Sequence, residues 1–464
     1  MKRTLLFVLM FALAAMVGCG STSTNSNQNT SQTGSGSLFV TGEDAPLSSV
    51  VGFQLELQSV TLNGLSHTPT VVSDTTVDFA RLIGLRSPLA FNSVPADTYS
   101  SATITVSNPV ISYVDMTQNP PALNTINGTL PLAAATYQVT VQFPQAMVVD
   151  SNGLAGLKME MDIRQSVTVN SSGQVSGAVT PVFYIKATKA SDPDGLITDL
   201  EGGLVSVSGD SFVIQGPYGR QLTVDVSNST NFNSGWSITN LAPPAFVSVQ
   251  GTFQADGTLS ATGVEVITTA HSFVSGRILQ VVNNSSGDAQ QVTMWVGETG
   301  ADMVKDVDTI QTINISAVSD YEICFFDGAL TQLLFNDTSL IVGQRVFVGG
   351  SYVSGVFTPQ MISLRRQGVY GMFNPASVTV TNSPNGGTFT ISNNGLAGYL
   401  TDGTVTVDTF NGTVFYNLTG LNQLQTTSTA IPIVARGLFL KNPLNNNAPT
   451  FFAGFVSDPP QATN

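Results

Sequence analysis

Charged residues are scarce in this sequence. They make up 10% of its 464 residues, against about 25% in ordinary soluble domains. Only 16 residues are Lys or Arg, the formal net charge is −14, and the densest basic spot is the pair Arg365-Arg366. Because phosphate groups and anionic lipid surfaces are bound by basic stripes, this composition argues against nucleic-acid partners and against electrostatic docking on lipid headgroups.

Cysteine and histidine are almost absent. The cysteines are Cys19 and Cys324, and the histidines are His67 and His271. A Ser-His-Asp triad would have to use one of the two histidines, and a structural zinc site would lack ligands. Cys324 lies in an apolar, strand-like run, where we expect a small buried side chain. We therefore expect no enzyme, no metal and no cofactor, while a pair of carboxylates that cleaves glycosides remains an alternative.

Long apolar runs are missing except at the N-terminus. Lys2-Arg3 precedes residues 5–17, an apolar stretch too short to span a bilayer and typical of a signal-peptide core. Gly18-Cys19 follows this stretch, with Met16 where a leucine is usual. The arrangement resembles the lipobox of bacterial lipoprotein signals and implies that Cys19 is acylated. The alternative is an ordinary secretory signal that is cut nearby.

The residues after Cys19 indicate a location. An aspartate at the next position is the usual inner-membrane retention signal of lipoproteins, and Gly20 stands there instead. The resemblance therefore implies a protein of the cell envelope, with the outer membrane favoured. Residues 1–19 form the predicted signal peptide ending at the acylated cysteine. Residues 20–36 contain mainly Ser, Thr, Asn, Gln and Gly and are predicted to form a flexible tether.

The rest of the chain has the pattern of β-strands. Polar and apolar residues alternate in segments such as 53–57 and 222–226, and β-branched residues are frequent in the second. Dipeptides such as Asn152-Gly153, Asp256-Gly257 and Asn411-Gly412 predict tight hairpin turns. One or two helical turns are expected only at residues 79–85. These features predict an all-β protein.

Changes in pattern divide the chain into domains. A β-sandwich is predicted before residue 188, and a degenerate repeat of short strands follows, for which closure into small barrels is the economical solution. The predicted segments are a sandwich at 37–187, a linker at 188–199, and barrel repeats at 200–270, 271–367 (with insertions) and 368–458 (degenerate). Acidic side chains gather at residues 192–201, namely Asp192, Asp194, Asp199 and Glu201. We interpret them as part of a solvated linker and leave calcium binding open.

Two stretches carry a family resemblance. Asp44-Ala45-Pro46 and the segment 94–99 resemble an uncharacterised family of N-terminal lipoprotein domains with a Thr-Asp-Ala-Pro signature, although Glu43 and Asp97 depart from its motifs. This resemblance covers about residues 36–187 and implies a prealbumin-like β-sandwich. Residues 246–266 resemble an uncharacterised family of tandem β-barrels similar to the oligonucleotide/oligosaccharide-binding (OB) barrel. The expected fold is thus an N-terminal sandwich followed by about three small OB-like barrels.

Two tryptophans are candidate binding residues. If Val292, Met294 and Val296 face the core of a barrel, Trp295 lies on the opposite face of the strand. There it is either exposed as a platform for a sugar or protein, or covered by a contact between domains. Trp236 lies in a loop and is open to the same two interpretations.

These observations predict a membrane-anchored, exported lipoprotein that acts as a non-catalytic binding or scaffold module at the cell envelope. Its expected partners are the membrane, through the lipid anchor, and a glycan or an envelope protein. The alternatives are a carbohydrate-binding surface protein, for which Trp295 or Trp236 would provide the stacking surface, and an enzyme with an unrecognised carboxylate pair.

Overall fold

The computed structural model describes residues 34–45, 49–82, 87–169, 174–216, 219–326, 330, 333–381, 385–392 and 403–458. These residues lie in one compact unit, Gln32–Asn464. The predicted signal peptide, Cys19 and nearly all of the tether fall outside the described residues. Within the described part, no helix combines the length and the apolar character needed to cross a bilayer.

The prediction of an all-β protein is confirmed, with 64% of the described residues in strands. The α-helices among the described residues are α1 (Ile163–Ser166) and α2 (Leu421–Thr426), of four and six residues. The short helix expected near residue 79 is the 3-10 turn η1 (Phe79–Leu82). Helix is therefore confined to brief connections between strands.

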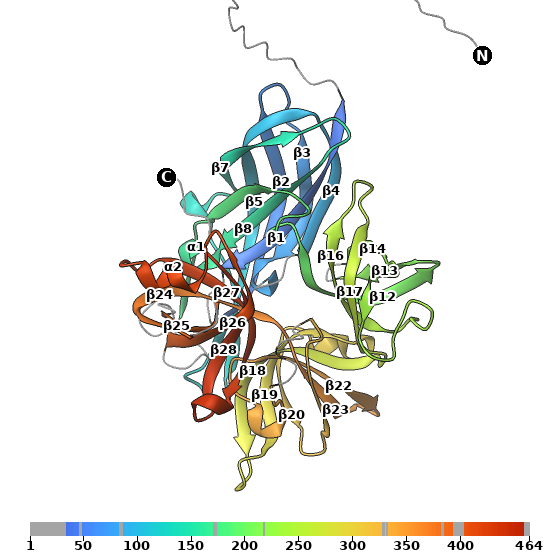
Figure 1. The fold of residues 1–464 in the computed structure, drawn as a ribbon, viewed down its shortest axis with the longest axis vertical. Helices are drawn as coiled ribbons and strands as arrows, with labels where there is room; N and C mark the ends of the chain where they lie inside the picture. The colour runs from blue at the N-terminus through green and yellow to red at the C-terminus, as the bar shows by residue number, and fades with distance from the viewer. Residues whose placement is uncertain are drawn as a thin grey trace, which may run out of the picture. The chain divides into compact units, whose positions relative to one another are not determined.

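The N-terminal sandwich consists of two sheets that enclose one apolar core (Figure 1). Along β2, alternate residues Phe53, Leu55 and Leu57 are fully buried, as the period of a strand with one core face requires. One sheet has the order β11-β8-β1-β4; the other has the order β3-β2-β5-β6, with β7 also paired to β5. Its strands are β1 (Ser35–Ala45), β2 (Val50–Gly64), β3 (Thr70–Asp78), β4 (Ser87–Pro95), β5 (Asp97–Asp115), β6 (Ala122–Asn127), β7 (Thr136–Val149), β8 (Leu154–Asp162) and β11 (Phe183–Thr188), beside a small hairpin of β9 (Val167–Val169) and β10 (Val175–Val179).

Three further β-modules follow the sandwich and share one strand order. In each module the first strand pairs with the second and with the next-to-last, the second pairs with the third, and the next-to-last pairs with the last. The first module contains β12 (Ile197–Ser208), β13 (Ser211–Gln215), β14 (Gln221–Asp225), β15 (Asn231–Phe232), β16 (Phe246–Phe253) and β17 (Leu259–Thr268). The common order is what an internal repeat predicts.

The second and third modules vary this arrangement. The third closes into a five-stranded barrel, and β14 of the first module also pairs with β17. The strands of the second module are β18 (Ser272–Asn283), β19 (Ala289–Thr299), β20 (Thr309–Asn314), β21 (Asp320–Ile323), β22 (Arg345–Val353) and β23 (Val356–Leu364), and those of the third are β24 (Gln367–Val380), β25 (Gly387–Ser392), β26 (Thr404–Tyr416), β27 (Pro432–Asn442) and β28 (Ala448–Ser457). The expected sandwich followed by small barrel-like repeats is therefore confirmed as an all-β architecture.

Some of the predicted turn dipeptides form turns and one does not. Asn152, between β7 and β8, and Gly257, between β16 and β17, adopt positive φ values of 62° and 91°, which tight turns require. The turn at Gly257 joins a hairpin, whereas the turn at Asn152 joins strands of two different sheets. Asn411-Gly412, in contrast, lies within β26. The pairing of β26 with β28 shifts register between Thr409 and Val414, so this dipeptide occupies an irregular part of a strand, and the prediction of a turn there is wrong.

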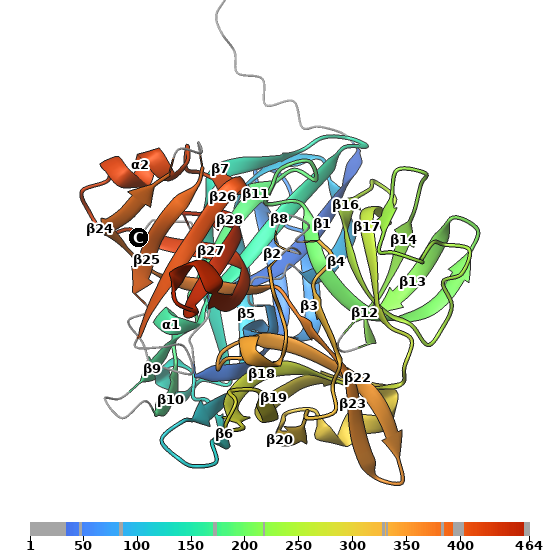
Figure 2. The ribbon, with the colours of Figure 1, turned by 60° about the horizontal axis from the view of Figure 1, so that its bottom comes forward.

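The four modules contact one another in a closed series, and their sheets are arranged like the blades of a four-bladed propeller (Figure 2). Each neighbouring pair shares ring stacking or a hydrogen bond between distant parts of the chain. The contacts are Phe39 on Phe253 (sandwich to first module), Phe246 on Phe273 and Phe347 (first to second), Gln344 Nε2 to the Phe439 carbonyl (second to third) and Lys186 Nζ to Tyr416 Oη (third to sandwich). These contacts fix the modules as one body.

Candidate functional site

A cavity of about 460 Å³ lies where the sandwich and the first two modules meet. This volume falls within the range of about 300–1,000 Å³ that is typical of small-molecule sites. Much of its wall is apolar and includes Leu82, Leu89, Phe91, Leu222, Phe253 and Trp295. Charged side chains complete it: Asp78, Arg81, Asp199, Glu201, Arg220, Arg277, Glu298 and Arg345. An apolar wall with a few convergent polar groups is the usual composition of a ligand site.

Trp295 belongs to this wall and is not exposed. Val292, Met294 and Val296 face the core of the second module, as expected. Trp295 lies on the other face of β19, yet only 7% of its surface is accessible, because Val51 and Val114 of the sandwich pack against it. The prediction of an exposed platform is wrong, and the alternative, a contact between domains, holds.

A β-bulge places Glu298 at the cavity together with Trp295. Consecutive residues of β18 pair with Val296 and Glu298, so Gly297 is the extra residue of the bulge. Because of this extra residue, the side chain of Glu298 lies on the same face of the strand as that of Trp295. A Cβ atom at position 297 would lie 2.7 Å from Cη2 of Trp295. Glycine is therefore needed there for the indole ring to fold back over the bulge.

Glu298 is a partly buried carboxyl group that forms no hydrogen bond or ion pair within the described part of the chain. Burial and the negative charge of Glu201 raise the pKa of Glu298 to about 7, although Arg345 and Arg81 lower it. This carboxyl group therefore changes charge near neutral pH.

Arg81 joins the sandwich to the second module at the edge of the cavity. Its Nε donates to Asp78 Oδ2 over 3.1 Å, its Nη1 to the Gly297 carbonyl over 2.6 Å, and its Nη2 to Asp308 Oδ1 over 2.5 Å. The guanidinium carbon lies 5.8 Å from the centre of the Trp295 ring. All three nitrogens of Arg81 thus donate to acceptors of the protein, and Nη1 binds the bulge itself.

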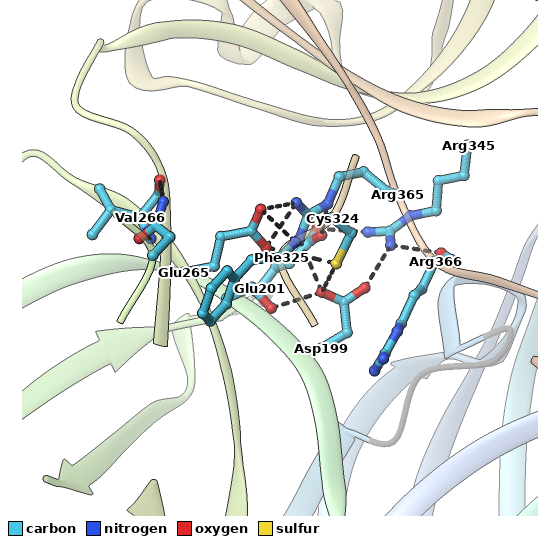
Figure 3. A network of polar contacts seen from close by, with 11 residues as sticks. Asp199, Glu201, Glu265, Val266, Cys324, Phe325, Arg345, Arg365 and Arg366 are labelled. Atoms are coloured by element: carbon cyan, nitrogen blue, oxygen red, sulfur yellow. Dashed lines mark hydrogen bonds and ion pairs between the residues drawn. The ribbon is translucent and has the colours of Figure 1, made fainter. Parts of the chain in front are cut away.

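A buried ion network forms the back of the cavity and fastens the first module to the second (Figure 3). Arg365 is fully buried and donates to Asp199 Oδ1 over 2.9 Å, to Glu201 Oε1 over 3.0 Å and to both oxygens of Glu265 over 2.9 Å. Arg345 adds a bond to Glu201 Oε2 over 2.5 Å and a longer one to Asp199 Oδ2 over 3.5 Å. Two cations from the second module thus bind three carboxylates of the first.

The arginines of this network act on the pKa values of the buried acids. Burial raises the pKa of Asp199, but Arg365, Arg345 and Arg366 outweigh it and hold the pKa below the usual value. The pKa of Glu265 is raised, since its burial outweighs the effect of Arg365.

Cys324 is buried, as expected, with Sγ 3.6 Å from Glu265 Oε2. Asp199, Glu265 and Cys324 place potential metal-ligand atoms within 4.8 Å of one another. The guanidinium group of Arg365, however, binds both carboxylates and occupies the place of a cation. These residues fit an arginine and not a metal ion.

The acidic segment 192–201 is not a solvated linker. Asp194, Asp199 and Glu201 are all buried. Asp194 accepts from Lys186 Nζ over 2.9 Å, whereas Asp199 and Glu201 belong to the arginine network. The described residues that could hold a metal ion together do not include Asp192, Asp194 or Glu201. These acids are close together in sequence, but in the fold Asp194 pairs with a lysine, whereas Asp199 and Glu201 pair with arginines of the second module.

Two other residues singled out from the sequence, Trp236 and Cys19, do not contribute to this cavity as described. Trp236 follows β15 in a loop, is partly buried and packs against the core of the first module. It does not line the cavity described here. Cys19 lies outside the described residues. Glu298 was not recognised from the sequence, where a glycine inside a strand pattern at position 297 was the available signal of a bulge.

Comparison with known proteins concerns one module. The search of curated proteins gives no match. The match of a family model begins just before β12 and ends within β17, so it covers the first module alone. Residues 195–265 match the family described as a domain of unknown function, DUF5666.

Proposed function

We propose that this chain is a lipoprotein of the bacterial cell envelope that binds a small ligand in the cavity between the sandwich and the first two modules, without catalysing a reaction. The cavity of about 460 Å³ carries this proposal, because its size and mixed wall are those of a ligand site. Gly18-Cys19 after the apolar residues 5–17 supports anchoring through an acylated Cys19. Gly20 favours the outer membrane.

The packing around the cavity supports binding by a preformed site. Arg365 and Arg345 fasten one wall to another, and Arg81 fastens the sandwich to the bulge at Gly297. A site held in this way orders few groups when a ligand enters, and so loses little of the binding free energy to conformational entropy. A scaffold role alone would not require a cavity at this junction.

Two other functions share this site. A carbohydrate ligand is favoured by Trp295 in the cavity wall, because sugar rings stack on indole. Hydrolysis by a carboxylate pair is favoured by the raised pKa of Glu298 beside Glu201. Glu201, however, accepts from Arg345 and Arg365 and contributes to the contact between modules. We therefore place ligand binding first.

Retrieval of a ligand from envelope extracts tests the proposal. The mature protein is incubated with glycan, lipid and metabolite fractions and analysed by native mass spectrometry. Ala90→Phe places a larger side chain in the cavity wall, and Ala376→Phe, at an exposed position of β24, is the matched control. We expect a bound small molecule in the wild type and in Ala376→Phe, and none in Ala90→Phe.

Two results would contradict this function. One is the absence of any bound molecule from every fraction. The other is equal retention by Ala90→Phe, which would place the ligand elsewhere on the protein. Conversion of the retrieved molecule during incubation, lost in Glu298→Gln, would support the hydrolytic alternative in its place.

A further inference from the structure

We propose that the ligand of this cavity is a small amphipathic cation, whose protonated nitrogen pairs with Glu298 while its apolar part lies against Trp295, Phe91 and Phe253. This inference rests on the proposed function and names the chemical class of its ligand.

Glu298 differs from the other acidic groups of the cavity. Among the described residues, four acidic side chains line it, and three of them accept hydrogen bonds from arginine: Asp78 from Arg81, and Asp199 and Glu201 from Arg345. Within the described part of the chain, Glu298 accepts none. A carboxylate shielded from water is unfavourable without a paired cation or a proton. Glu298 is partly buried and reaches the cavity, so a cation supplied by a ligand can pair with it.

The arginines near Glu298 have other acceptors. The three nitrogens of Arg81 donate to Asp78, the Gly297 carbonyl and Asp308. Arg345 donates through Nη1 to Asp199 and the Arg366 carbonyl, and through Nη2 to Glu201. A reorientation of either side chain toward Glu298 would break bonds that hold modules together. A cation supplied by a ligand requires no such change.

The rest of the cavity wall favours a ligand with an apolar part. Trp295 and the pair Phe91 and Phe253, whose ring centroids are 6.2 Å apart, contribute aromatic surface from three modules. Aromatic rings also attract a cation through their faces, and tryptophan does so most strongly. A molecule with a protonated amine at one end and a ring or short chain at the other matches both parts of the wall.

Proton exchange adds a dependence on pH. The charged groups that act on the pKa of Glu298 are Glu201 from β12, Arg345 from β22 and Arg81 from η1, and Arg277 from β18 lines the same cavity. Because the arginines stay charged in this range and burial raises the pKa of Glu298 to about 7, binding of a cation at pH 6 displaces a proton. Affinity for an amine should therefore rise by close to tenfold between pH 6 and pH 8.

The test compares three probes that share a phenyl ring and differ in the head group: 2-phenylethylamine, 2-phenylethanol and 3-phenylpropionate. Dissociation constants are measured at pH 6 and pH 8 by calorimetry, in two buffers of different protonation enthalpy. We expect the amine to bind at least tenfold more tightly than the alcohol at pH 8, with proton release at pH 6. Glu298→Gln should abolish the preference and the proton release and leave the affinity for the alcohol within about twofold.

The outcomes separate this inference from the proposed function. If the alcohol or the acid binds as tightly as the amine or more tightly, the ligand is not a cation. If Ala90→Phe weakens that binding, the cavity is still the ligand site. A preference for the amine that survives in Glu298→Gln would also overturn the inference of a cationic ligand. Failure of all three probes to bind, together with failure to retrieve a ligand from extracts, would overturn both.

Discussion

Replacement of Arg365 by methionine should destabilise the protein strongly. The guanidinium group is fully buried and serves Asp199, Glu201 and Glu265, each of which is less than 10% exposed. Arg365→Met keeps an apolar side chain of considerable length but leaves three buried carboxylates with only Arg345 as a direct ion-pair partner. Loss of one partner of a buried ion pair costs about 3–5 kcal/mol, and we expect a loss in this range at pH 7.5.

The expected loss depends on pH with a defined sign. Because Arg365 lowers the pKa values of Asp199 and Glu265, both rise when it is removed, so the folded variant binds more protons than its unfolded chain between about pH 4 and pH 7. Its stability therefore falls as the pH rises through this interval, relative to the wild type. The difference in unfolding free energy between the two proteins should be smaller at pH 5 than at pH 7.5.

Urea unfolding at the two pH values measures this difference, with Arg366→Met as the matched control. Arg366 follows Arg365 directly, acts on Asp199 through its charge and donates through Nη2 to the Phe326 carbonyl. Removal of its side chain should therefore cost less than removal of Arg365, about 1–2 kcal/mol. A loss below about 1 kcal/mol for Arg365→Met at pH 7.5 would refute the account of the network. A loss that is larger at pH 5 than at pH 7.5 would refute it as well.

Three further variants test other parts of the structure. Trp295→Ala should lower the unfolding free energy in urea by about 3 kcal/mol or more, as for a core aromatic, and a loss within 0.5 kcal/mol would mean that the indole is exposed. Glu298 is protonated more readily in the folded state, so its contribution to wild-type stability should fall by no more than about 3 kcal/mol as the pH rises from 4.5 to 7.5. Glu298→Gln should remove this part of the pH dependence. An unchanged slope of unfolding free energy against pH in the variant would contradict the raised pKa. Cys19→Ser should release the protein into the soluble fraction of cells, and a fully membrane-bound variant would exclude an anchor at Cys19.

Alternation along single strands was enough to predict the class of the fold. The core face of β19 could be assigned from Val292, Met294 and Val296 because the period of a strand is a local property. What lies against the opposite face could not be assigned. Trp295 is covered by Val51 and Val114, which are remote in sequence, and nothing local to β19 specifies that contact.

Charge pairing was hidden for the same reason. Asp199 and Glu201 follow a segment rich in Asp, Pro and Gly, which is typical of a solvated linker. Their partners, Arg345 and Arg365, lie 146 and 166 positions after Asp199. A sequence on its own does not show which of its few arginines is brought to which acid. Gly297 was the one local sign of the bulge that sets Glu298 at the cavity.

Binding at the cavity is tested most directly through the emission of Trp295. The chain contains two tryptophans, so Trp236→Phe leaves Trp295 as the only indole and places the reporter in the cavity wall. The three phenyl probes are titrated into this variant and into the same variant carrying Ala90→Phe. We predict a saturable change of emission with at least one probe, absent after Ala90→Phe. No saturable change with any probe, or the same change in both proteins, would contradict a ligand site at the junction of the sandwich and the first two modules.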